Sequence, residues 1–181
     1  MRFSETAISG VWLMEPIANF DARGSFARTF SVEEFKEHGL ASGFTQHSIS
    51  HSYLKHTLRG LHFQTYPYEE EKLVTCIQGA IWDVAVDLRP ESPTYLRWTA
   101  AILSPEQRLH FYIPKGCAHG FQSLRDDSVV SYLITTPYKP EHASGMRYDD
   151  AALAIDWPAK PTVISEKDKN WPLLAPQPVD A

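Results

Sequence analysis

Residues 57–64 have the sequence Thr57-Leu58-Arg59-Gly60-Leu61-His62-Phe63-Gln64, and Lys72 begins the apolar run Lys72-Leu73-Val74 a few residues later. These two segments place a histidine, an arginine and a lysine within sequence that is typical of β-strands. A cation buried in such a strand needs a charged partner or a ligand, because leaving it unpaired away from water costs free energy. Residues 57–72 are therefore a candidate site within a β-rich fold.

The bulk composition is that of an ordinary globular protein. The chain has 181 residues, 43% hydrophobic and 22% charged, which suffices for one domain with a sizeable core. We expect a single domain over residues 1–181, with residues 175–181 a flexible tail. The formal charge of -5 without a basic run argues against a nucleic-acid partner. No targeting segment or membrane-spanning apolar run is present, so we predict a cytoplasmic protein without a membrane partner.

Strand-like segments dominate the rest of the sequence. Residues rich in β-branched and aromatic side chains, separated by short turns, predict strands within 72–89, 95–104, 108–114 and 129–135. This spacing favours a β-sandwich or barrel. The clearest helix covers Ser31 to Leu40, because residues 31–34 form a capping box and Gly39 weakens the far end. A further helical turn is expected from Ser104.

Two spacings resemble the motifs of the cupin superfamily, whose members are jelly-roll barrels built as a double-stranded β-helix. The first is His62-x-Gln64 followed by Lys72, with six residues between Lys72 and Gly79, and the second is the PxGxxH run that ends at His119. In metal-binding cupins these positions supply histidines and a glutamate. An ammonium at the glutamate position cannot coordinate a divalent cation, and an amide is a poor substitute for imidazole. The pattern predicts an all-β cupin with a few short helices, no catalytic metal and no cofactor.

Without a metal, the pocket is expected to work by acid-base chemistry. Period-two alternation places His62 and Gln64 on one side of their strand, and Lys72 can point into the same cavity. Asp83 lies in an apolar run and should be paired, with Lys72 or His62 as the expected partner. Tyr132 lies in a strand that can aim its hydroxyl inward. A base, an acid on the opposite face and a cation for the enolate oxygen are the requirements for proton abstraction next to a carbonyl.

Many ordered motifs together resemble the dTDP-4-dehydrorhamnose 3,5-epimerase family. The resemblance runs from about residue 3 to Leu174, which makes it far more specific than the cupin spacing alone. The motifs are Asp21-x-Arg23-Gly24-x-Phe26, the 58–64 stretch, Lys72-Leu73-Val74, Asp83-Val84-x-Val86-Asp87-Leu88-Arg89-x-x-Ser92-Pro93-Thr94, Ile113-Pro114-x-Gly116-x-Ala118-His119-Gly120-Phe121, Tyr148-Asp149-Asp150, Ile155-x-Trp157-Pro158 and Ser165-x-Lys167-Asp168.

The resemblance implies roles for individual residues. His62 would remove the protons from C3 and C5 of a 4-keto sugar, with Asp168 holding its ring. Tyr132 would return a proton to the opposite face, with Tyr138 as the alternative acid, and Lys72 would stabilise the enolate oxygen at C4. Further positions correspond to the binding of the nucleotide diphosphate and sugar: Arg23, Phe26, Gln46, Ser48, Arg59, Gln64, His119, Tyr138 and Lys167. Forked guanidinium donors and a point-charge lysine suit a pyrophosphate.

The family resemblance also implies a homodimer, in which an N-terminal strand crosses to the partner barrel, so that residues 20–26 act in trans. Three positions depart from the family pattern. Arg28 and Ala143 stand where glutamates are usual, and Ser48 stands where an asparagine is frequent. These positions, with Asp83, belong to supporting or binding sets, so the departures concern recognition of the base or sugar. The substrate is expected to be a dTDP sugar, or a sugar carrying a different nucleotide.

Every candidate residue has a structural interpretation as well. These alternatives are a core histidine (His62), a structural ion pair (Lys72 with Asp83), a core phenol (Tyr132), surface or interface cations (Arg23, Arg59), a turn residue (His119) and a solvated charged loop (Asp168). Three functions follow from the sequence. The first is epimerisation at C3 and C5 of a nucleotide-linked 4-keto-6-deoxy sugar. The second is epimerisation at one carbon or on another nucleotide, and the third is nucleotide-sugar binding without turnover.

Overall fold

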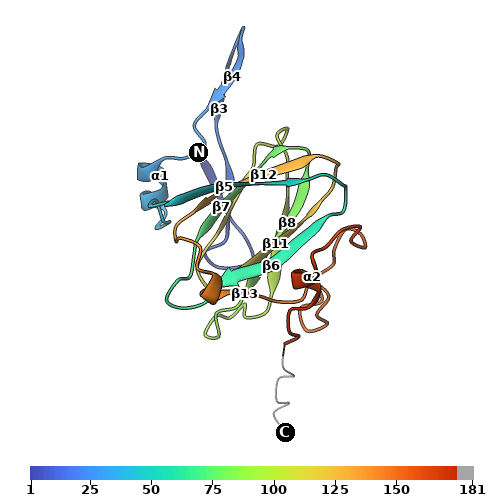
Figure 1. The fold of residues 1–181 in the computed structure, drawn as a ribbon. Helices are drawn as coiled ribbons and strands as arrows, with labels where there is room; N and C mark the ends of the chain where they lie inside the picture. The colour runs from blue at the N-terminus through green and yellow to red at the C-terminus, as the bar shows by residue number, and fades with distance from the viewer. Residues whose placement is uncertain (175–181) are drawn as a thin grey trace.

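The computed structural model describes residues 1–174, so the flexible tail predicted for residues 175–181 lies outside the described residues. Strands and two short α-helices connect as Figure 1 shows. The strands are β1 (Arg2–Glu5), β2 (Trp12–Glu15), β3 (Ala18–Asp21), β4 (Gly24–Ala27), β5 (Gln46–Ser52), β6 (Leu58–Gln64), β7 (Lys72–Gln78), β8 (Ile81–Asp87), β9 (Trp98–Leu103), β10 (His110–Ile113), β11 (Cys117–Ser123), β12 (Ser128–Ile134) and β13 (Ala143–Gly145).

Two antiparallel sheets form the barrel. One has the strand order β1-β2-β10-β7-β12-β5 and the other the order β13-β6-β11-β8-β9. The main core cluster lies between them, since it joins Val74 and Val130 of the first sheet to Ile81, Ala85 and Phe121 of the second. This two-sheet arrangement is the jelly roll predicted from the sequence. The strands predicted within 72–89, 95–104, 108–114 and 129–135 are confirmed.

The helices are short and lie outside the sheets (Figure 1). Helix α1 covers Val32–Glu37, and Ser31 caps it by accepting a hydrogen bond from the backbone of Glu34. The chain leaves this helix through Gly39 at φ +68°, a conformation that suits glycine. Helix α2 covers Glu166–Lys169, and a 3₁₀ helix, η1, covers Pro140–His142. The turn expected from Ser104 is a single one, closed by a hydrogen bond from the backbone N–H of Arg108 to the Ser104 carbonyl.

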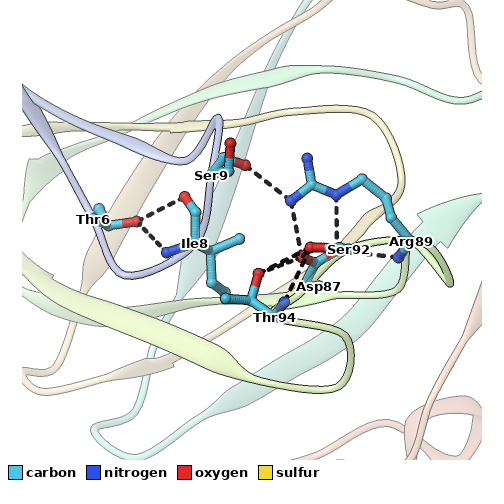
Figure 2. A network of polar contacts seen from close by, with 7 residues as sticks. All are labelled: Thr6, Ile8, Ser9, Asp87, Arg89, Ser92 and Thr94. Atoms are coloured by element: carbon cyan, nitrogen blue, oxygen red, sulfur yellow. Dashed lines mark hydrogen bonds and ion pairs between the residues drawn. The ribbon is translucent and has the colours of Figure 1, made fainter.

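A buried polar network ties the N-terminal segment to one end of the barrel. Asp87 accepts hydrogen bonds from the Arg89 guanidinium at 2.8 and 2.9 Å and from the hydroxyls of Ser92 and Thr94 (Figure 2). Arg89 also donates to the main-chain carbonyl of Ser9 at 2.9 Å. Burial raises the pKa of Asp87, but these donors outweigh it and hold that pKa well below its usual value. The network is structural, because it lies outside the cavity described below.

The third sheet is a two-stranded hairpin, β3-β4, that projects away from the barrel (Figure 1). Its aromatic side chains Phe20 and Phe26 are 69% and 75% exposed. Within residues 1–174, no helix is long and apolar enough to span a bilayer. The single domain predicted for residues 1–181 stays a prediction, because the last residues are not described.

Candidate active site

A cavity of about 640 Å³ opens between the two sheets. This volume is in the range of pockets that hold small ligands. Most of the residues predicted for the site line it: Gln46, Ser48, Arg59, His62, Gln64, Lys72, His119, Tyr132, Tyr138, Ala143, Lys167 and Asp168. They come from distant parts of the sequence, and the barrel topology brings them together.

The lining residues reach the cavity because of strand alternation. His62 and Gln64 are two residues apart on β6 and both face the cavity, as predicted. Lys72 begins β7 and Tyr132 lies on β12, the strand that pairs with β7. His119 on β11 is the antiparallel partner of His62, so the two imidazoles stand on neighbouring strands. Two sheets therefore contribute to one pocket.

His62 is hydrogen-bonded to Asp168, with 2.6 Å between Nε2 and Oδ1. The histidine side chain is 43% exposed, whereas the aspartate side chain is only 5% exposed. Burial raises the pKa of Asp168. The hydrogen bond and charge of His62 and the backbone N–H of Gly60 lower it by more, so the pKa of Asp168 lies below its usual value. The lowered pKa favours the ionised form of Asp168, and because this side chain is buried, the solvated-loop interpretation of Asp168 is wrong.

The local backbone explains how Asp168 reaches this position. Ser165 caps α2 by accepting a hydrogen bond from the Asp168 backbone at 3.0 Å, which turns the carboxylate toward β6. Gly60 donates its backbone N–H to Oδ2 at 3.2 Å. Gly60 has φ +134°, and a Cβ there would lie 2.6 Å from the Gly120 Cα on β11. Only glycine permits this close approach of β6 and β11 beside the His62–Asp168 pair.

A second histidine–carboxylate pair lies deeper. His119 Nε2 and Asp83 Oδ1 are 2.7 Å apart, and their side chains are 7% and 0% exposed. Asp83 was predicted to pair with Lys72 or His62, which is wrong. Asp83 on β8 faces Phe121 in the β8–β11 register, which places the carboxylate behind His119 rather than beside Lys72. Burial raises the pKa of Asp83 despite the opposing effect of His119.

Two phenols line the cavity. The Tyr132 hydroxyl lies 2.9 Å from Ser50 Oγ, and its ring lies 6.1 Å from that of His119. Burial raises the pKa of Tyr132, so this phenol stays protonated at neutral pH. Tyr138 is more exposed, at 57%, and its backbone N–H donates to Gln46 Oε1. Both tyrosines therefore present a phenol to the cavity.

The cations of the cavity differ in how firmly they are held. Lys72 forms a salt bridge of 3.0 Å with Glu70. Arg59 donates to Ser52 Oγ at 3.3 Å and to the His51 carbonyl at 3.0 Å. Lys167 lies over the Trp171 ring, with Nζ 5.0 Å from its centroid. Three positive side chains on one cavity suit an anionic ligand.

Similarity to known proteins identifies the family. The family model described as dTDP-4-dehydrorhamnose 3,5-epimerase matches residues 5–176. The chain belongs to the dTDP-4-dehydrorhamnose 3,5-epimerase family. This confirms the resemblance noted in the sequence and assigns the chain to a family of sugar epimerases, which are isomerases.

Individual relatives of this epimerase-family chain cover almost its whole length. The dTDP-4-dehydrorhamnose 3,5-epimerase of Methanothermobacter thermautotrophicus is 46% identical over 98% of this chain and 97% of that protein. The dTDP-4-dehydrorhamnose 3-epimerase of Streptomyces niveus is 37% identical, over 97% and 84%. The crystal structure of the Legionella pneumophila enzyme in complex with dTDP-4-keto-L-rhamnose superposes with a TM-score of 0.89 and 38% identity, covering 95% of this chain and 92% of that one. The cupin-type fold is thereby confirmed.

Besides Asp83, which lies behind His119, three predicted residues of this epimerase-family chain do not line the cavity. Arg23 and Phe26 are on the β3-β4 hairpin, where Arg23 is ion-paired with Asp21 at 2.6 Å. Arg28 follows β4 and is exposed. The structure of one chain therefore does not bring these residues to His62, and the action of residues 20–26 in trans stays a prediction.

Two residues near the site were not found from the sequence. Glu70 lines the cavity beside Lys72, and Trp171 donates its indole N–H to Asp168 Oδ1 at 3.3 Å. Both left a signal in the sequence, since Glu70 precedes Lys72 by two residues and Trp171 follows Asp168 at helical spacing. Among residues 1–174, no group of three or more histidine, cysteine or acidic side chains is arranged to hold a metal ion.

Proposed function

We propose that this chain epimerises C3 and C5 of a nucleotide-linked 4-keto-6-deoxy sugar, converting dTDP-4-dehydro-6-deoxy-D-glucose into dTDP-4-dehydro-L-rhamnose. The observation that carries the proposal is the short hydrogen bond from His62 to a buried Asp168, on the wall of a cavity that Lys72 and Tyr132 also line. This arrangement supplies a base, a cation and an acid around one ligand site.

The reaction needs no net oxidation. His62 takes the proton from C3, the C–H electron pair forms the enolate, and the negative charge moves to the C4 oxygen, which Lys72 stabilises. Asp168 stabilises the imidazolium that forms. Tyr132 then delivers a proton to the opposite face of C3, and the same sequence at C5 inverts the second centre. Tyr138 is the alternative proton donor.

A dTDP sugar is the substrate that the relatives support best. The Legionella pneumophila structure contains dTDP-4-keto-L-rhamnose, and the cations Arg59 and Lys167 line the cavity of this chain. Binding of dTDP, UDP, CDP and GDP, measured by calorimetry, tests the choice of nucleotide. Clear preference for dTDP would show that the departures at Arg28, Ser48 and Ala143 leave base recognition unchanged. Preference for another nucleotide would contradict the dTDP assignment.

A second candidate is epimerisation at C3 alone, favoured by the similarity to the Streptomyces niveus 3-epimerase. Incubation of dTDP-4-dehydro-6-deoxy-D-glucose with the protein in deuterated water distinguishes the two. Deuterium at both C3 and C5 supports the first function, and deuterium at C3 alone supports the second. The absence of label at either carbon, with binding retained, would contradict both and support a sugar-binding protein without turnover.

The homodimer with exchange of the N-terminal strand is also part of the proposal, together with a cytoplasmic location. It is supported by the projecting β3-β4 hairpin (Figure 1), whose aromatic side chains Phe20 and Phe26 are 69% and 75% exposed in one chain. Light scattering of the purified protein should give twice the mass of the chain. A dimer in which Arg23→Ala weakens nucleotide binding would support action in trans, and a monomer with full activity would exclude it.

A further inference from the structure

We propose that Glu70 is a positioning residue that fixes the Lys72 ammonium for the enolate oxygen. This rests on the role given to Lys72 in the proposed function. Glu70 and Lys72 both line the cavity, and their salt bridge is 3.0 Å long with side chains only 7% and 11% exposed. An ion pair this deep differs from a surface pair, because water screens it little.

The contacts of Lys72 leave one donor for the substrate. The ammonium carries three N–H groups. One donates to Glu70 Oε1, and a second donates to the main-chain carbonyl of His62 at 3.4 Å. Both acceptors belong to segments that border the base, so the third N–H is available toward the ligand space. A lysine held at two points is preorganised for an oxyanion that forms only during the reaction.

The burial of the second carboxylate oxygen of Glu70 explains why the Lys72 ammonium stays beside this carboxylate. Oε2 is buried and has no hydrogen-bond partner among residues 1–174, and Lys72 forms the one salt bridge described for this carboxylate. If the ammonium moved away, a buried carboxylate would remain without compensation, which is strongly unfavourable. Glu70 therefore holds Lys72 in the cavity rather than letting its flexible stem turn toward solvent.

The test is a double-mutant cycle. Glu70→Ala should lower kcat for epimerisation by about 10-fold with little change in KM, because orientation of Lys72 matters mainly in the transition state. Glu70→Gln, whose amide oxygen still accepts from the ammonium, should restore most of that loss. In a Lys72→Met background, Glu70→Ala should change the rate less than about 2-fold, since the residue that it positions is absent.

Glu69→Gln is the matched control, because it removes a neighbouring carboxylate that does not line the cavity. It should leave kcat within about 2-fold of wild type. Equal losses for Glu70→Ala with and without Lys72 would overturn the proposal, as would a kcat that rises or stays unchanged in Glu70→Ala. Urea unfolding of each variant identifies losses caused by misfolding. Failure of the proposed function is distinct, because the wild-type protein would then incorporate no deuterium.

Discussion

The two histidine–carboxylate pairs of the cavity have the same chemistry and opposite surroundings. His62 is nearly half exposed and its partner Asp168 accepts hydrogen bonds from His62, from the Gly60 backbone and from the Trp171 indole. His119 and Asp83 are both buried, and Asp83 Oδ2 has no partner among residues 1–174. The two histidines stand on neighbouring strands, so the difference arises from the depth of each pair and from the number of donors to each carboxylate.

This difference separates a pair that can exchange protons with a ligand from a pair that shapes the pocket. An accessible imidazole can accept and release a proton when the carboxylate behind it is ionised and accepts several hydrogen bonds from the protein. A buried pair whose carboxylate has its pKa raised resists carrying separate charges. In the proposed function we therefore expect proton transfer at His62, and we expect His119 to help position the sugar.

The largest effect should come from His62→Ala. Removal of the base should lower the rate of deuterium incorporation at C3 by about 100- to 10,000-fold. His51→Ala is the matched control, because His51 also pairs with an aspartate, Asp127, at 3.1 Å but lies outside the cavity. The control should stay within about 2-fold of wild type. An unchanged rate in His62→Ala would disprove the catalytic assignment.

The second prediction compares Asp168→Asn with Asp83→Asn. Asp168→Asn should lower kcat by about 100-fold or more, since loss of the orienting carboxylate disturbs the tautomer of the base. Asp83→Asn should lower kcat by less than about 10-fold, because its amide oxygen can still accept from His119. Steady-state kinetics of the two purified variants measure both values. Equal losses would mean that the two pairs share the chemistry.

The third prediction concerns the pH dependence of folding. Because the folded-state pKa of Asp83 is raised above 3.8, the folded state binds more protons, and the contribution of Asp83 to stability falls as pH rises from 3.8 through the folded pKa. Asp168 has a lowered folded pKa, so its contribution is present above 3.8 and is lost as pH falls through that lower value. The contributions of the two carboxyl groups to the free energy of unfolding should therefore change with pH in opposite directions.

Urea unfolding of wild type and both asparagine variants between about pH 3 and pH 7 measures these slopes. Asp83→Asn should gain stability relative to wild type as pH rises above 3.8, the usual value for aspartate. The deficit of Asp168→Asn should shrink as pH falls below 3.8. Slopes of the same sign for both variants would contradict a raised pKa for Asp83 and a lowered pKa for Asp168.

The sequence predicted much of this architecture because local patterns carry it. The alternation around His62 and Gln64 predicts which side chains face inward, and the capping box predicts the start of α1 at Ser31. The family motifs predicted Asp168 as the partner of His62, whereas the local sequence alone predicts a solvated loop at this position. The hydrogen bond between His62 and Asp168 agrees with the predicted pairing, although its catalytic role stays a prediction.

The failures have a common cause, which is the register between distant strands. The partner of Asp83 depends on how β8 pairs with β11, and alternation within β8 does not contain that information. The burial of Glu70 Oε2 without a hydrogen-bond partner among residues 1–174 depends on how deep this side chain lies in the fold, which the sequence around it does not contain. The place of Arg23 and Phe26 depends on whether a second chain is present. Sequence patterns predict faces of strands, but not which strands meet.

The smallest effect is expected for Trp171→Phe. The phenyl ring preserves most of the packing against Gly145, whereas the indole N–H to Asp168, at 3.3 Å, is lost. A hydrogen bond to a charged group contributes on the order of 1 kcal/mol here, so kcat should fall by about 2- to 10-fold while KM changes little. Trp157→Phe is the control, because its indole donates to the Tyr148 carbonyl away from the cavity.

A matched loss of kcat in both tryptophan variants would show that the effect is one of general packing. If instead only Trp171→Phe lowers kcat, and the loss disappears in an Asp168→Asn background, the indole acts through the carboxylate. That result would complete the contrast between the two pairs. Asp168 would owe its low pKa and its fixed orientation to several donors at once, whereas burial keeps the pKa of Asp83 raised, with His119 as its one hydrogen-bond donor among residues 1–174.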